Sequence, residues 1–334
     1  MTKPVIFGCE TTTLSAIERQ FFRDADPLGF ILFARNCETP TQIRRLVGEL
    51  RDSVGRADAP ILIDQEGGRV ARLKPPHFPA YPSAAEIAAL GGLRAREAAW
   101  LAARLIADDL GQLGITIDCA PVLDLPVAGA DPVIGDRAWG NEPRLVAENG
   151  LAVCDGLMAG GVLPIIKHIP GHGRATVDSH RALPVVETAR ATLDSTDFAA
   201  FRALSGMPWA MTAHVLYTAI DPDRPATLSP RVIADVIRAG IGFDGVLLCD
   251  DLSMAALGGR IETRAGDALQ AGCDLVLHCN GILDEMTTVA GAIGEISEAG
   301  SHRVAAAEAR RKAPSAFDRY AAEREFAALL DDRR

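Results

Sequence analysis

The feature that most constrains the fold is the regular alternation of short apolar runs with longer segments of helical character. The runs are rich in Val, Ile and Leu and are bounded by Gly, Pro or polar residues, which is typical of strands buried on both faces. Eight such runs are spread along the whole chain, at residues 5–7, 29–33, 61–63, 115–119, 163–166, 210–212, 246–249 and 275–277.

The segments between these runs are rich in Ala, Leu and Arg, which favour helices. We expect helices at residues 40–54, 93–113, 144–159, 195–204, 230–239 and 261–271. Buried strands joined by helical crossovers form a parallel sheet, and eight such units favour closure into a (β/α)8 barrel of the TIM type. An open, doubly wound α/β sheet is the alternative.

The chain of 334 residues contains no Pro-, Gly- or Ser-rich linker and no sequence repeat that would divide it. We therefore predict a single catalytic barrel domain over residues 1–300. Residues 301–334 are rich in Ala, Arg and Glu. We expect them to form a helical tail that packs on the barrel or extends from it.

The composition excludes several classes of partner. A formal net charge of -10 provides no positive field for nucleic acid or an anionic membrane. The first residues lack the pattern of a signal peptide, and no apolar stretch approaches the ~20 residues of a membrane span. Seven cysteines without a CxxC pair indicate reduced core residues. We expect a cytoplasmic monomer.

Polar side chains come directly after four of the predicted strands. Asp64 follows the third, His168 the fifth, His214 the sixth and Asp250 the seventh. One Asp after a strand is often only the cap of a helix. In a parallel barrel, however, all the carboxyl ends of the strands meet at one mouth, so four such residues together indicate a functional site there.

The densest polar segment is residues 167–180, KHIPGHGRATVDSH. Gly171 and Gly173 allow its backbone to approach a ligand closely. The spacing of Asp178 and His180 lets the carboxylate bond one imidazole nitrogen and leave the other free for proton transfer. The segment is therefore a candidate acid/base pair, and a flexible loop with solvated side chains is the alternative.

The seventh predicted strand ends in two carboxylates, Asp250 and Asp251. Successive side chains of a strand point to opposite faces, so only one faces the mouth. If the site cleaves a glycosidic bond, that carboxylate can attack the anomeric carbon, and we expect the other to cap the following helix. Near the same mouth, Arg72, Arg137 and Lys167 could bond sugar hydroxyls or a carboxylate of the leaving group.

Two alternatives of other kinds remain open. The histidines at 168, 172, 180 and 214 could surround a metal ion together with Asp250, which would make the protein a metal-dependent hydrolase on a barrel. The sequence has no HxH or HExxH spacing, so we expect neither a metal nor another cofactor. A carbohydrate-binding or regulatory barrel without turnover is the second alternative.

Over residues 4 to 290 the sequence resembles glycoside hydrolase family 3 and, within it, the bacterial β-N-acetylglucosaminidases. The resemblance lies in five motifs: GFILFARN at 29–36, DQEGGR at 64–69, GDRAWG at 135–140, KHIPGHGRATVDSH at 167–180 and DDLSM at 250–254. The Lys-His-x-Pro-Gly-His-Gly segment followed by Asp-Ser-His is the most specific of them.

The resemblance implies a retaining enzyme in which Asp250 is the nucleophile and His180 is the acid/base, assisted by Asp178. It also implies sugar contacts by five further residues, which are Asp64, Arg72, Arg137, Lys167 and His168. No metal is implied. The implied biology is the cytoplasmic recycling of cell-wall fragments, in which terminal N-acetylglucosamine is released from 1,6-anhydro-N-acetylmuramyl peptides, so the partner would be a muropeptide substrate.

Overall fold

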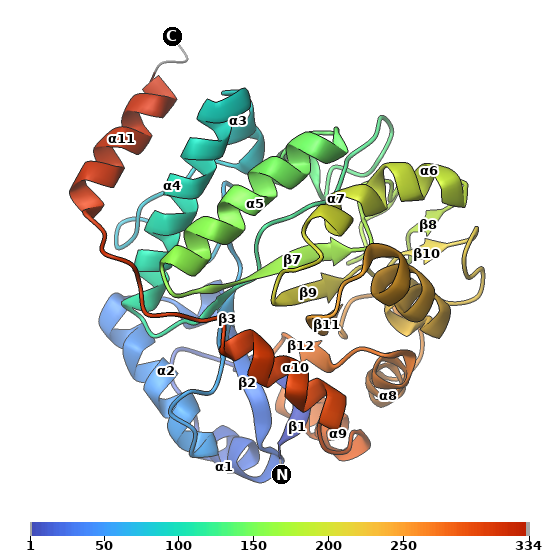
Figure 1. The fold of residues 1–334 in the computed structure, drawn as a ribbon. Coiled ribbons are helices and arrows are strands. Elements are labelled where there is room, and N and C mark those ends of the chain that lie inside the picture. Colours follow the sequence, from blue (N-terminus) through green and yellow to red (C-terminus); the bar gives the residue numbers. More distant parts are fainter. Residues whose placement is uncertain (1, 332–334) are drawn as a thin grey trace.

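Within residues 2–331, which the computed structural model describes, eight parallel strands close into a barrel in the order β1-β12-β11-β9-β7-β6-β3-β2 (Figure 1). The strands are β1 (Lys3–Phe7), β2 (Pro27–Leu32), β3 (Ile61–Ile63), β6 (Ile117–Asp118), β7 (Leu163–Ile169), β9 (Trp209–Thr212), β11 (Val246–Asp251) and β12 (Leu275–His278). Each predicted strand overlaps one of these. The TIM-type barrel is therefore confirmed, and the open sheet is wrong.

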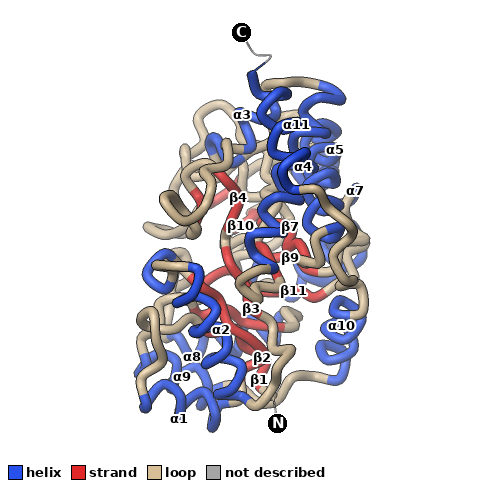
Figure 2. Tube along the Cα trace, turned by 90° about the vertical axis from the view of Figure 1, so that its left-hand side faces the viewer, coloured by secondary structure: helices blue, strands red, loops and turns tan. Residues whose placement is uncertain are grey.

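Helices surround the strands, which lie in the middle of the molecule (Figure 2). They are α1 (Ala16–Ala25), α2 (Pro40–Val54), α3 (Ala84–Ala88), α4 (Gly92–Gly111), α5 (Pro143–Ala159), α6 (Arg190–Ser195), α7 (Asp197–Ala203), α8 (Ile261–Ala271), α9 (Leu283–Ala292), α10 (Glu298–Glu308) and α11 (Arg319–Asp331). Short 3₁₀ helices occupy Ala34–Asn36, Gly135–Arg137 and Ala226–Leu228, and Val232–Ile241 is π-helical. None of the helices in the described part of the chain is both long and apolar enough to cross a membrane.

The predicted helices at 40–54 and 261–271 have the observed bounds of α2 and α8, and both ends of α2 carry local signals. Thr39 caps α2 by accepting the N–H of Gln42 (3.2 Å), Pro40 is its first residue, and Gly55 ends it at a φ of 63°. The predicted helix at 195–204 is instead divided into α6 and α7 at Thr196, whose φ of −120° and ψ of −88° are not helical.

The strands supply a continuous apolar core. In β11 the residues from Val246 to Cys249 are fully buried, whereas Asp250 and Asp251 at its carboxyl end are half-buried. Full burial of an aliphatic side chain contributes roughly 1.5–3 kcal/mol relative to leaving it exposed. The same strand therefore provides both the anchor in the core and the polar residues at the mouth.

Two small sheets follow strands of the barrel and build up its mouth. β4 (Gln65–Gly67) and β5 (Val70–Ala71) form an antiparallel hairpin directly after β3. β8 (Val185–Val186) pairs in parallel with β10 (Leu216–Tyr217), and these strands come after β7 and β9. Neither sheet was predicted, because its strands are only two or three residues long.

The C-terminal helices cover other parts of the barrel. Arg303 of α10 bonds Asp244 and Asp274, which lie just before β11 and β12, so α10 lies at the amino end of the barrel. α11 packs beside α4 (Figure 1), where Arg319 contacts two carboxylates of that helix. Since α10 begins at Glu298, a boundary at residue 300 would fall inside it. The division of the chain at that point stays a prediction.

Candidate active site

A cavity of about 410 Å³ opens at the carboxyl ends of the barrel strands. It is lined by all eight residues that the sequence predicted for catalysis and sugar binding: Asp64, Arg72, Arg137, Lys167, His168, Asp178, His180 and Asp250. These residues are spread over nearly 190 positions of the chain and come together because their strands are parallel.

Asp250 lies at the carboxyl end of β11, and its Oδ1 accepts the N–H of Asp251 at 2.8 Å. Burial alone would raise the pKa of Asp250, but the imidazoles of His168 and His214 and the Asp251 hydrogen bond hold it below its usual value. The carboxylate is thus ionised at neutral pH, as attack on carbon requires.

Asp251 does not cap the next helix, contrary to the prediction. Its carboxylate accepts the N–H and the hydroxyl of Ser253, at 3.1 and 2.5 Å, and the N–H of Cys279 at 3.1 Å. α8 begins only at Ile261, and therefore too far along the chain to be capped. Asp251 instead ties the turn after β11 to the end of β12.

Five charged side chains form a row of alternating sign beside this cavity, and we call it the ion-pair row; all of them except Glu66 line the cavity. Lys167 Nζ lies 2.7 Å from Asp64 and 2.6 Å from Glu66. Asp64 also pairs with Arg72 at 2.8 Å, and Glu66 pairs with Arg137 through two bonds of 2.9 Å. The order along the row is Arg72, Asp64, Lys167, Glu66, Arg137.

The charges of the row stabilise one another. Burial by itself would lower the pKa of Lys167, yet Asp64 and Glu66 raise it above its usual value. Burial would likewise raise the pKa of Asp64, yet Lys167 and Arg72 hold it well below its usual range. Asp64 and Lys167 are consequently charged at neutral pH, and the ion pairs fix the side chains of the row before a ligand arrives.

The sequence analysis missed two carboxylates of this region. Glu66 stands in the DQEGGR segment two residues after Asp64, so the motif itself contained the signal for it. Asp124 lies in no predicted strand and is fully buried. Its carboxylate accepts the backbone N–H of His172 at 2.6 Å and lies 2.6 Å from Nδ1 of His168. Asp124 therefore orients the His168 ring.

The remaining histidines of the predicted set also have partners of their own. Nε2 of His172 lies 3.1 Å from the Ser179 hydroxyl, and burial lowers the pKa of His172 to about 4, so the ring is neutral. His214 contacts the Thr227 hydroxyl and the carbonyl of Asp251, at 2.7 and 3.0 Å. Among residues 2–331, no three His, Cys, Asp or Glu side chains are grouped so that they could hold a metal ion.

Asp178 and His180 form the expected pair. Asp178 Oδ1 lies 2.8 Å from Nδ1 of His180 and also accepts the backbone N–H of His180 at 2.9 Å. Burial would raise the pKa of Asp178, but the hydrogen bonds from His180 lower it. Because Nδ1 is engaged, Nε2 remains for proton transfer. The His180 side chain is 67% exposed, so this half of the site is on the solvent side.

The loop that carries this pair is anchored at its base. A Cβ at Gly173 would come within 2.0 Å of the Leu125 carbonyl oxygen, so the backbone contact there requires glycine. Arg174 forms an ion pair with Asp197 at 2.6 Å, and the carbonyl of Ser179 accepts the N–H of Ala256 at 3.0 Å. Only the outer part of the loop is exposed.

The comparison with sequence families gives one clear match. Residues 14–311 match the family model described as "Glycosyl hydrolase family 3 N terminal domain". A protein named Beta-hexosaminidase from Alkalilimnicola ehrlichii is 39% identical over 284 residues, which are 83% of this chain and 80% of that protein. The Beta-hexosaminidase of Neisseria meningitidis serogroup B is 38% identical over 292 residues, and the match covers 85% of this chain and 80% of that protein.

Solved structures agree with this match. One is NagZ from Neisseria gonorrhoeae, solved in complex with N-trifluoroacetyl-D-glucosamine. Its sequence is 32% identical to this one, the TM-score is 0.88, and the match covers 98% of each chain. A family 3 β-N-acetylglucosaminidase from Paenibacillus sp. str. FPU-7 is 32% identical, with a TM-score of 0.85, and the match covers 98% of this chain and 66% of that one. The family expected from the sequence motifs is confirmed.

A first prediction concerns the anchor at Gly173. We expect Gly173→Ala to displace the loop, because the added Cβ would overlap the Leu125 backbone, and to cost about 1–3 kcal/mol of stability. Hydrogen exchange followed by mass spectrometry should show faster exchange over residues 171–180 than in the wild type. Gly206→Ala is the matched control, since a Cβ there meets nothing within 4 Å. Unchanged exchange in Gly173→Ala would contradict the anchoring role.

Proposed function

The chain belongs to glycosyl hydrolase family 3, and from this premise we propose that it is an exo-acting β-N-acetylglucosaminidase that works through a covalent glycosyl-enzyme with retention of configuration. The family match and the relatives support a glycoside hydrolase of the β-N-acetylhexosaminidase type. The observation that carries the finer proposal is the meeting of Asp250 and the Asp178–His180 pair in one cavity beside the ion-pair row.

In the first step, a carboxylate oxygen of Asp250 attacks the anomeric carbon of the terminal sugar. The bond from that carbon to the glycosidic oxygen breaks, and protonated Nε2 of His180 gives its proton to the departing oxygen. The products are a glycosyl ester on Asp250, a free alcohol and a neutral imidazole. Asp178 stabilises the imidazolium before transfer and keeps the ring oriented.

In the second step, the neutral Nε2 of His180 takes a proton from water, and the water oxygen attacks the same carbon from the face that the alcohol left. The ester bond to Asp250 breaks, so the carboxylate and the imidazolium are restored. Two inversions at one carbon give net retention. The exposed position of His180 suits this step, because water can reach it.

The ion-pair row supplies a preorganised surface for sugar hydroxyls. The carboxylate of Asp64 accepts hydrogen bonds, and the ammonium of Lys167 and the guanidinium of Arg72 donate them. Since these groups hold one another in place, little conformational entropy is lost when the sugar binds. His168, oriented by Asp124, and Arg137 complete this set of proposed contacts.

For the natural substrate we propose muropeptides with a 1,6-anhydro-N-acetylmuramyl unit, cleaved in the cytoplasm during peptidoglycan recycling by the monomeric protein. Two observations support this. The match to the solved NagZ relative covers 98% of each chain, and the exposed Asp178–His180 side of the cavity leaves room for a large leaving group. The negative net charge gives no support to nucleic acid or membrane as a partner.

The sugar preference is tested with two chromogenic substrates. We expect 4-nitrophenyl N-acetyl-β-D-glucosaminide to be hydrolysed with a kcat/KM at least roughly 10²-fold above that of 4-nitrophenyl β-D-glucoside, because a pocket built for a hydrogen-bonding group rejects the analogue that lacks it. A preference for the glucoside would contradict the proposed substrate. No hydrolysis of either would instead favour a binding protein.

The nucleophile is tested by trapping. A 2- or 5-fluoro glycosyl fluoride slows breakdown of the ester, so peptide mass spectrometry should find the label on Asp250. Asp250→Asn should lower kcat by at least about 10³-fold, since the amide is a poor nucleophile. A label on another residue, or an inverted product seen by proton NMR, is incompatible with the mechanism.

The acid/base is tested by leaving-group dependence. His180→Ala should lower kcat/KM by about 10²–10⁴-fold for a disaccharide-like leaving group, which needs protonation, and much less for 2,4-dinitrophenol, which does not. Arg181→Ala, next in sequence and outside the cavity lining, is the matched control. Equal losses on both substrates would show that His180 is not the proton donor.

A further inference from the structure

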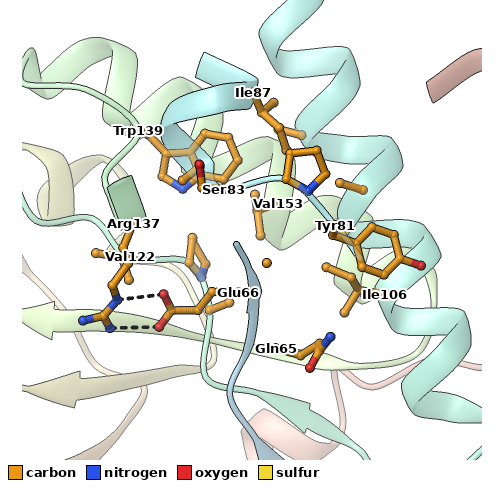
Figure 3. Close-up of a pocket in the computed structure, with 18 of the residues that line it drawn as sticks. Gln65, Glu66, Tyr81, Ser83, Ile87, Ile106, Val122, Arg137, Trp139 and Val153 are labelled. Carbon is orange, nitrogen blue, oxygen red and sulfur yellow. Dashed lines mark hydrogen bonds and ion pairs between the residues drawn. The ribbon is translucent and has the colours of Figure 1, made fainter. Parts of the chain in front are cut away.

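A second, smaller cavity lies on the other side of the ion-pair row. Its volume is about 30 Å³, enough for about two water molecules, since one needs roughly 10–15 Å³. Glu66 and Arg137 form one side, while α4 and α5 contribute apolar side chains such as Ile106 and Val153 (Figure 3). Arg69 and Arg137 line both cavities, whereas Glu66, the ion-pair partner of Arg137, lines only the smaller one.

A carboxyl group lines this cavity and has no role in the mechanism above. Asp118 ends the short strand β6, is 1% exposed, and pairs in register with Ile63, the residue just before Asp64. Its Oδ1 accepts the backbone N–H of Gln65 at 2.9 Å. Its Oδ2 is buried and has no hydrogen-bond partner among the described residues.

Three charged groups act most strongly on Asp118. Lys167 from β7 attracts its ionised form, whereas Asp64 and Glu66 from the segment after β3 repel it. The other ionisable groups around the cavity are Arg69, Asp136, Arg137 and the Tyr81 phenol, and the Cys119 thiol is next in sequence. The α4 and α5 side chains that line the cavity are all apolar.

Burial is the main influence on the acidity of this group. It raises the pKa of Asp118 to about 7, against the lowering effects of the Gln65 N–H and Lys167. Below that pH the group is a neutral acid whose hydroxyl can bond water in the cavity. Above it, a negative charge appears beside two carboxylates of the sugar-binding wall.

We propose that Asp118 is a positioning residue for the sugar site: its Oδ1 holds Gln65, and so the segment carrying Asp64 and Glu66, while its neutral state leaves Lys167 to those two carboxylates. On ionisation it competes with those two carboxylates for Lys167, and the ion-pair row loosens. This role rests on the proposed function, because it assumes that the row binds sugar. Its consequence is a loss of sugar affinity as the pH rises through neutrality.

The test is Asp118→Asn, which keeps an oxygen for the Gln65 N–H but cannot ionise. The Kd of N-acetylglucosamine, measured by calorimetry from about pH 5.5 to 8.5, should rise at least about fivefold for the wild type and stay nearly flat for the variant. Asp155→Asn is the matched control, because Asp155 is an exposed aspartate of α5 that lines neither cavity. A parallel rise in wild type and Asp118→Asn overturns the proposal.

Thermal unfolding gives a readout that does not depend on sugar binding. A folded pKa of about 7 lies above the ~3.9 of an aspartate in an unfolded chain. The protonated group therefore contributes stability that is complete below the lower pKa and is lost as pH rises through the upper one. Between about pH 4 and 7 the Tm of the wild type should therefore fall relative to that of Asp118→Asn. Above pH 7 the difference between the two Tm values should stay constant.

The two readouts separate the possible failures. If the Tm difference between wild type and Asp118→Asn does not change with pH, the proposal is overturned. It is also overturned if that difference changes with pH but the Kd of the two proteins rises in parallel. If the wild type neither binds N-acetylglucosamine nor hydrolyses its aryl glycoside at any pH, the proposed function fails and the positioning role with it, while the Tm series still reports whether Asp118 ionises. If Asp118→Asn does not fold, Asp118→Ser serves in both measurements.

Discussion

The buried ammonium group of Lys167 is the interaction on which the site depends. It lies on β7, is 2% exposed, and contacts Asp64 and Glu66 from the segment after β3. An unpaired charge at this depth would be strongly unfavourable, so each of the three groups requires the others. The same contacts align the side chains proposed to bind sugar, and the three charges act on the buried carboxyl group of Asp118.

The two proposed catalytic groups are held differently. Asp250 ends a strand whose preceding residues are fully buried, so its position follows from the packing of the barrel. His180 lies on a loop that is anchored at Gly173, Arg174 and Ser179 but exposed at the histidine itself. A fixed nucleophile suits attack at one carbon, and an exposed acid/base suits the exchange of a leaving alcohol for water.

Much of the fold followed from the sequence because the determining signals are local. Buried parallel strands are continuous apolar runs, so all eight were found, and the caps of α2 lie within a few residues of its ends. The helix expected at 195–204 is present as α7, but it starts later than predicted because Thr196 is not helical. Its neighbour Asp197 bonds Arg174 of the loop, a contact that nothing in the helical pattern indicates.

The sequence by itself determined the barrel, the family and which side chains meet at the mouth, because strand ends in a parallel barrel converge whatever the loops do. Only the tertiary structure decided how those side chains are paired. It joined Lys167 to residues about a hundred positions away, placed Asp124 under His168, turned Asp251 toward Cys279 and enclosed Asp118. Burial and charge pairing arise between distant segments, so no local pattern encodes them.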